Sequence, residues 1–166
     1  LKAEPKKDSV TVIDGTDVSQ QKKRYKMDGA FYSFVSMAIS GGTKGDGVLN
    51  ITSTTYEGLD TEMHLTVSGG VVNVNSEDDG INVNEDDVSV FTLNGGTLTI
   101  VASGGDGIDS NGYIYLNSGK LDITSAGTAT GPEGPLDSDK GTYNNLGANY
   151  TYQTTGGMGD GGTPPD

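Results

Sequence analysis

The chain has 166 residues, enough for one domain, and its 23 acidic residues against ten basic ones give a formal net charge of −13 at pH 7. This balance argues against a nucleic-acid partner, because few basic side chains are present to neutralise a run of phosphates. The absence of cysteine excludes disulfides and thiolate metal sites, and a single histidine, His64, excludes a histidine-cluster metal site. No apolar run approaches the roughly 18 residues of a membrane span, so we expect no membrane insertion.

The N-terminal segment, residues 1–44, holds eight of the ten basic residues. We expect it to form a cap or arm. Within it Val35, Met37 and Ile39 alternate with other residues, which predicts a strand that leads into the rest of the fold. Residues 45–139, by contrast, hold 16 acidic residues and one basic residue, Lys120. Any function proposed for this segment must explain why so many acidic residues lie close together.

The central segment, residues 45–140, repeats itself. Three stretches share a pattern of alternating apolar residues on both sides of a glycine corner: Leu65–Ser76, Phe91–Ala102 and Ile114–Ser125. A second motif of the type Asp-Gly-Ile-Asx falls between the copies, at residues 57–60, 79–82, 106–109 and, as Gly-Pro-Leu-Asp, at 134–137. We match its glycines as Gly58, Gly80, Gly107 and Gly134, which are spaced by 22, 27 and 27 residues.

The two-residue period of the apolar positions indicates short β-strands. One pair of such strands cannot bury its apolar row alone, whereas coils stacked on one another bury it continuously. The sequence therefore predicts an all-β fold, a single-stranded parallel β-helix with about 22–27 residues per coil. An antiparallel β-sandwich is the alternative, although sandwiches do not repeat the same residues in register at each turn. We expect residues 141–155 to cap the C-terminal end and the Gly/Pro-rich residues 156–166 to form a disordered tail.

The repeat also arranges acidic and amide side chains in three columns. The first contains Asp60, Asn82, Asp109 and Asp137; the second, two residues later, contains Glu62, Asn84, Asn111 and Asp139; the third, just before the shared glycine, contains Glu57, Asp79 and Asp106. Neighbours in a column lie one strand apart, about 4.8 Å, where two bare carboxylates repel each other by roughly 1 kcal/mol in water and ~3.5 kcal/mol at an effective dielectric constant of 20.

A calcium ion relieves this repulsion. Calcium binds hard oxygens at about 2.3–2.6 Å, so it joins ligands about 5 Å apart on adjacent coils. We therefore expect structural Ca²⁺, more than one ion, with the candidate ligands Asp60, Asp79, Asn82, Asn84, Asp106, Asp109, Asn111, Asp137 and Asp139. The alternative is that Asp, Asn and Gly are ordinary turn residues whose side chains cap nearby backbone amides.

Two strings, EDDGINVNEDDVSVFTLNGGTLTI (77–100) and GDGIDSNGYIYLNSGKLDI (105–123), resemble the secreted bacterial carbohydrate-binding proteins of the pectate-lyase-like β-helix fold. The resemblance covers residues 45–140 and implies a right-handed coil in a secreted or cell-surface protein. It also implies binding of plant cell-wall polysaccharide, polygalacturonate (pectin) or cellulose, and calcium at residues 79–84 and 106–111, with Asp60 and Asp137 as outer members. The first and last copies depart from the motif, at Glu57-Gly58-Leu59 and Gly134-Pro135, which weakens the outer sites.

Candidate sugar-binding residues follow from strand alternation. If Ile114 and Leu116 point inward, Tyr113 and Tyr115 point outward, where tyrosine rings can stack on sugar rings. Further candidates in the C-terminal stretch are Tyr143, Tyr150 and Tyr152. Exposed tyrosines also occur on solenoid faces that bind nothing.

Two other functions share these sequence features. A calcium-rigidified structural or adhesin segment of a larger cell-surface protein would contain the same coils without a glycan site. A polysaccharide lyase would need a Lys or Arg base, and the coils offer only Lys120, with Lys140 beyond them. The sequence therefore does not favour an enzyme, and we assign no catalytic residue.

Overall fold

The computed structural model describes residues 28–128 and 134–156. Residues 1–27 of the predicted N-terminal cap or arm and residues 157–166 of the predicted tail lie outside the described part. The described chain contains β1 (Phe31–Ser33), β2 (Met37–Ile39), β3 (Val48–Thr52), β4 (Leu59–Thr61), β5 (His64–Ser76), β6 (Ile81–Val83), β7 (Val90–Ala102), β8 (Ile108–Ser110), β9 (Tyr113–Leu116), β10 (Lys120–Ser125), β11 (Leu136–Ser138), β12 (Gly141–Asn144), the 3-10 turn η1 (Gly147–Asn149) and β13 (Tyr150–Thr154).

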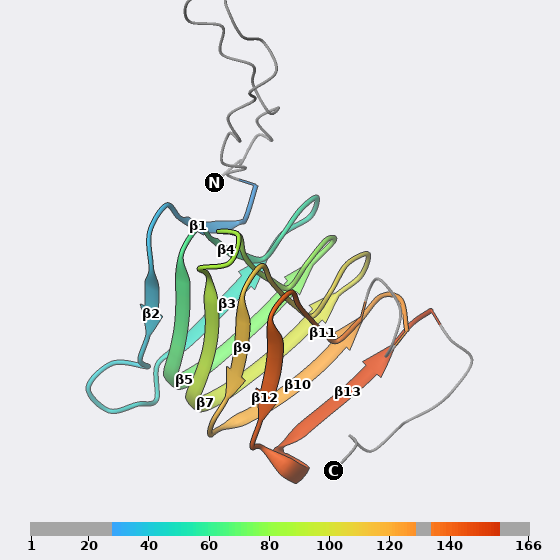
Figure 1. Cartoon of the computed structure of the whole chain (residues 1–166). Coiled ribbons are helices and arrows are strands. Elements are labelled where there is room, and N and C mark those ends of the chain that lie inside the picture. The colour runs from blue at the N-terminus through green and yellow to red at the C-terminus, as the bar shows by residue number, and fades with distance from the viewer. Residues whose placement is uncertain (1–27, 129–133, 157–166) are drawn as a thin grey trace, which may run out of the picture.

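These strands form a β-solenoid of about five turns with three faces (Figure 1). The first face contains β1, β4, β6, β8 and β11. The second contains β2, the first halves of β5 and β7, β9 and β12, and the third contains β3, the second halves of β5 and β7, β10 and β13. Every strand pair in the described residues is parallel, which confirms the predicted all-β parallel β-helix and excludes the antiparallel sandwich.

The core is built from the apolar positions that the repeat matched. Register partners in successive coils are Leu65, Phe91 and Ile114; Val67, Leu93 and Leu116; Val72, Leu98 and Leu121; and Val74, Ile100 and Ile123. All of these side chains are buried. Because alternate residues of a strand point to opposite sides, the residues between them face outward and remain free to vary.

The corner between the second and third faces requires glycine. Gly70, Gly96 and Gly119 occupy it in three successive coils, with positive φ angles of 84°, 85° and 110°. A Cβ atom on Gly96 would lie 2.6 Å from the carbonyl oxygen of Gly70, and one on Gly119 would lie 2.9 Å from the carbonyl oxygen of Gly96. The corner therefore excludes side chains both by backbone conformation and by the close approach of the neighbouring coil.

The last copy of the Asp-Gly-Ile-Asx motif, at residues 134–137, lies in register with residues 106–109 as aligned, but its glycine does not occupy the shared glycine position. Leu136 pairs with Ile108, and the amide of Ile108 donates to the carbonyl of Pro135 (3.1 Å). Pro135 therefore occupies the place of Gly107, and Gly134 occupies the place of Asp106. The prediction that Gly134 matches the glycines was wrong, because the final coil is one residue longer; the alignment of Asp137 with Asp109 is unaffected.

Parallel stacking extends on both sides of residues 45–140. On the N-terminal side, β1 pairs with β4 and the predicted leading strand, β2, pairs with β5. On the C-terminal side, β12 pairs with β9 and β13 pairs with β10. Among the described residues, we find no helix with the length and apolar character needed to span a membrane.

Candidate functional site

The first polar column exists as predicted and runs along the first face of the solenoid. Asp60 on β4 pairs with Asn82 on β6, Asn82 with Asp109 on β8, and Asp109 with Asp137 on β11. Asp60 directly follows the core residue Leu59, and Asp109 directly follows the core residue Ile108. Because neighbouring residues of a strand point to opposite sides, both carboxylates face away from the core. The column is thus a direct consequence of the coil register.

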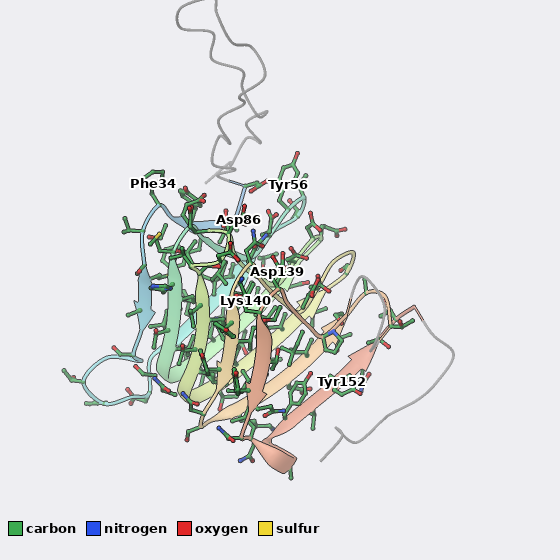
Figure 2. The ribbon with its side chains drawn as sticks, in the orientation of Figure 1. Phe34, Tyr56, Asp86, Asp139, Lys140 and Tyr152 are labelled. Carbon is green, nitrogen blue, oxygen red and sulfur yellow. The ribbon has the colours of Figure 1, made fainter. Side chains whose placement is uncertain are left out.

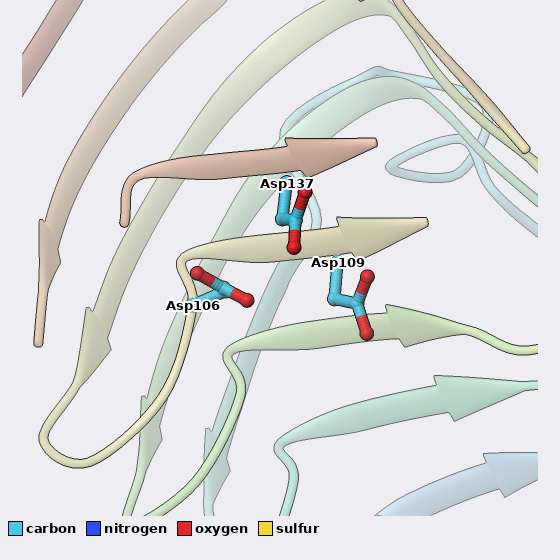
Figure 3. Close-up of side chains that lie close together, drawn as sticks. All are labelled: Asp106, Asp109 and Asp137. Carbon is cyan, nitrogen blue, oxygen red and sulfur yellow. The ribbon is translucent and has the colours of Figure 1, made fainter. Parts of the chain in front are cut away.

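At the C-terminal end of this column, three carboxylates converge. Oxygen atoms of Asp106, Asp109 and Asp137 all lie within 4.8 Å of one another (Figure 3). Asp106 and Asp109 belong to one coil and Asp137 to the next, and exposure increases from the buried Asp106 to the exposed Asp137. This set joins two coils, is open to solvent on one side, and has the chemistry of a cation site.

At the N-terminal end, the column is enclosed. Asp60 is only 1% exposed, and the segment Asp28–Gly29 lies directly over it, since a Cβ on Gly29 would collide with the Cβ of Asp60. Asp28, Glu57 and Glu62 are also buried. Burial, reinforced by the charges of Glu57, Asp28 and Glu62, raises the pKa of Asp60 from 3.8 to about 8.

Two buried oxygens in adjacent coils have no hydrogen-bond partner. They are Oδ2 of Asp60 and Oδ1 of Asn82, which are register neighbours in the first column. The other oxygen of Asp60 accepts a hydrogen bond from Nδ2 of Asn84 (2.6 Å). Buried polar atoms are nearly always satisfied, so this pair of oxygens one strand apart leaves unused acceptors at the enclosed end of the column.

The second column ties coils together. Nδ2 of Asn111 donates to the backbone carbonyl of Asn84 and to Oδ1 of Asp86, both at 2.8 Å. Asp139 at the end of the column is exposed (Figure 2). Asn84 and Asn111 therefore use their amide groups to connect neighbouring coils, and the structure does not bring Asp139 into the cluster of Asp106, Asp109 and Asp137.

The third column has the turn role that the sequence left open. Oδ1 of Asp79 accepts a hydrogen bond from the backbone amide of Asp106 in the next coil (2.8 Å), and Oδ1 of Asp106 accepts one from the backbone amide of Gly134. Burial also raises the pKa of Asp79 to about 8. Asp106 accepts a hydrogen bond from the next coil and also belongs to the carboxylate cluster, so the turn role is compatible with a place among the candidate cation ligands.

The tyrosines form a cluster of three on the second face. Tyr113 and Tyr115 lie on β9 at outward positions, as predicted, and Tyr143 on β12 pairs with Tyr115 in the next coil. The ring centroids lie 5.8 Å apart for Tyr113 and Tyr115, 6.1 Å for Tyr113 and Tyr143, and 5.1 Å for Tyr115 and Tyr143. Tyr143 is 53% exposed, so the cluster is accessible from solvent.

Tyr150 and Tyr152 do not contribute to this cluster. They pair with Leu121 and Ile123 on β10 and follow the inward register, and their rings stack on each other at 5.5 Å. Both belong to the core or pack against it, so they close the C-terminal end of the core. The sequence of β13 does not match the repeat, so the repeat did not predict whether Tyr150 and Tyr152 point inward or outward.

The two lysines considered as bases lie apart from each other. Lys140, labelled in Figure 2, forms an ion pair with Asp87. Lys120 lies on the third face, exposed, and pairs in register with Thr97. Neither lysine lies in the carboxylate cluster, and no catalytic arrangement was predicted around either.

Comparison with known proteins identifies the family. A family model described as carbohydrate-binding domain-containing protein matches residues 4–159, nearly the whole chain. No curated protein matches the chain, and no solved structure matches it. The match supports a carbohydrate-binding role with a glycan as the partner. The chain belongs to the family of carbohydrate-binding domain-containing proteins.

Proposed function

We propose that the protein is an extracellular, calcium-dependent module that binds plant cell-wall polysaccharide, polygalacturonate or cellulose. The observation that carries the proposal is the convergence of Asp106, Asp109 and Asp137 from two adjacent coils, with their oxygens within 4.8 Å of one another. Membership of the carbohydrate-binding family supports the glycan part of the proposal. The calcium part rests on the donor set and on its spacing.

Calcium fits this donor set well. Its ligands are hard oxygens at about 2.3–2.6 Å, so two oxygens on opposite sides of one ion lie about 5 Å apart. The spacing of the three carboxylates is compatible with one shared ion. The three candidate ligands are all carboxylates, and the chain has no cysteine to supply a thiolate, so the donor set favours a hard cation.

The exposed side of the cluster suggests how a glycan takes part. Asp137 faces solvent, so an ion held by these carboxylates would keep coordination positions open on that side. A uronate carboxylate can occupy such a position, which reconciles a protein of net charge −13 with an acidic polysaccharide. The tyrosine cluster of Tyr113, Tyr115 and Tyr143 offers rings for stacking on sugars.

We propose a further calcium ion at the enclosed end of the column. The unsatisfied oxygens of Asp60 and Asn82, and the three buried acids Asp28, Glu57 and Glu62 at this end, support it. Without a cation, burial favours the protonated form of Asp60, as its raised pKa indicates. An ion there would have a structural role, because the site is enclosed.

The experiment is a binding isotherm on insoluble polygalacturonate and on cellulose, with calcium and with EDTA. We expect the protein to bind at least one of the two and polygalacturonate binding to fall in EDTA. Asp109→Asn should lose calcium-dependent binding, whereas Asp46→Asn, at an exposed acid outside the columns, should retain it. No binding of the wild-type protein to either material would contradict the proposal and would favour the calcium-rigidified structural segment instead.

A further inference from the structure

The third face of the solenoid carries ordered rows of outward side chains. The strands β3, β5, β7, β10 and β13 pair in uninterrupted register along this face. The central row is Asn50, Asn73, Thr99, Asp122 and Thr151; one flanking row is Thr52, Asn75, Val101, Thr124 and Gln153, and the other is Val48, Val71, Thr97 and Lys120. Five strands at about 4.8 Å spacing make a surface roughly 19 Å across.

Charge is nearly absent from these rows. Of the fourteen described outward residues just named, only Lys120 and Asp122 are charged, and their charges cancel. The first face, by contrast, concentrates the acidic columns. The strands of the second face hold no Asp, Glu, Lys or Arg, so the third face is distinguished by its rows of amides and hydroxyls, and its near-neutrality suits a neutral ligand.

Two pairs of side chains on this face are joined across neighbouring coils by hydrogen bonds. Nδ2 of Asn73 donates to Oδ1 of Asn50 (2.8 Å), and Oγ1 of Thr151 donates to Oδ1 of Asp122 (2.9 Å). An amide has two donor hydrogens and two acceptor positions, so Asn50 and Asn73 keep capacity for a ligand. These contacts hold the side chains in place before any ligand arrives, which lowers the entropy cost of binding.

Apolar side chains lie between the polar ones. Val48 is 63% exposed and Val101 is 40% exposed. An extended polysaccharide presents hydroxyl groups at the edges of its rings and C–H groups on their faces. A surface that combines many amides and hydroxyls with a few valines matches both kinds of group.

We propose that the third face is a binding surface for a neutral polysaccharide chain or the surface of a neutral polysaccharide fibre. This inference rests on the proposed carbohydrate-binding function and assigns the neutral glycan to a face other than the one that carries the tyrosine cluster. An acidic glycan is disfavoured here, because these rows hold no group of cations to offset the repulsion of a negatively charged protein. Binding to this face is therefore independent of the carboxylate cluster.

The test uses one arginine substitution on each face. Thr99→Arg places a long charged side chain in the middle of the third face; Thr66→Arg places the same side chain at an outward position of the second face, two strands from Tyr115. Both threonines are half-buried outward residues, so the two substitutions are matched. Depletion isotherms on microcrystalline cellulose and on polygalacturonate, each with calcium, measure affinity, and thermal melts check folding.

We expect Thr99→Arg to weaken cellulose binding by about tenfold, because it places a clash and an unpaired charge at the centre of the interface. Calcium-dependent polygalacturonate binding should be unchanged, because that ligand does not cover the third face. Thr66→Arg should leave cellulose binding unchanged. If Thr99→Arg lowers the melting temperature, Asn73→Arg replaces it. Wild-type cellulose binding that survives both Thr99→Arg and Asn73→Arg, or that Thr66→Arg reduces equally, overturns the inference. Polygalacturonate binding by a wild-type protein that does not bind cellulose overturns it too, while leaving the proposed function intact.

Discussion

Tyr115 and Tyr143 stack on each other across two successive coils, with ring planes only 9° apart and centroids 5.1 Å apart. The stacking follows from their register on β9 and β12, which brings two outward tyrosines one strand apart. Tyr113 lies beside both rings. The second face thus presents a cluster of aromatic rings at the C-terminal end of the solenoid.

This relationship predicts a specific loss of glycan affinity. Tyr143→Ala removes an exposed ring from the cluster, and we expect the free energy of binding to weaken by about 1 kcal/mol, the value of one aromatic contact. The measurement is a binding isotherm on polygalacturonate with calcium. Tyr56→Ala, which removes a partly exposed tyrosine outside the cluster, serves as the control and should bind like the wild-type protein. Equal affinities of Tyr143→Ala and the wild type would show that this ring does not contact sugar.

Calcium is expected to stabilise the folded protein. An ion that binds only the folded state raises the free energy of unfolding by about 1.4 kcal/mol per site at a tenfold excess over its Kd. The wild-type melting temperature should therefore rise on addition of calcium, and the rise should be smaller for Asp109→Asn, which removes one of the three converging carboxylates. Asp122→Asn, on the third face, is the control. A wild-type melting temperature that does not respond to millimolar calcium would refute the calcium sites.

The stability of the calcium-free protein should depend on pH through Asp60. Its pKa is about 8 in the folded protein against an ordinary value of 3.8, so between these values the folded state keeps a proton that the unfolded state loses. The free energy of unfolding consequently falls as pH rises through this range. Melts in EDTA at several pH values measure the effect, to which Asp79 contributes in the same direction.

Asp60→Asn isolates one part of that dependence. Asparagine carries no charge to bury, so we expect the decline with rising pH to be shallower than in the wild-type protein. Asp46→Asn, at an exposed position, should leave the slope as it is. A slope identical in the wild type and in Asp60→Asn would mean that this carboxyl group does not titrate with a raised pKa.

Gly96 at the corner of the solenoid should not tolerate a side chain. Gly96→Ala combines a positive φ of 85° with a Cβ placed 2.6 Å from the carbonyl oxygen of Gly70. The conformation alone costs roughly 1–2 kcal/mol, and the collision adds to it. Gly42→Ala separates the two effects, because φ is 75° there and nothing lies within 4 Å of the added Cβ. In denaturant unfolding, Gly96→Ala should have a lower free energy of unfolding than Gly42→Ala. The reverse order would contradict the close packing at this corner.

The extent of what could be predicted differs between fold and site. The strand period, the glycine corners and the repeat length were sufficient to predict a parallel β-helix, since each is a local property that recurs at fixed spacing. The same spacing aligned Asp60, Asn82, Asp109 and Asp137, because residues that share a place in every coil must share a column. The match at Gly134 failed where the last coil is one residue longer, since a repeat contains no information about its own exceptions.

The sequence by itself thus determined the coil, its core and the first polar column. Only the tertiary structure decided that Asp28–Gly29 covers Asp60, that Asp106 turns toward Asp109 and Asp137, and that Tyr143 faces outward while Tyr150 and Tyr152 face the core. Burial of a charge depends on which segment lies over it. The approach of carboxylates from different coils depends on side-chain direction. A residue's position within its own strand determines neither the burial of its charge nor the direction of its side chain toward another coil.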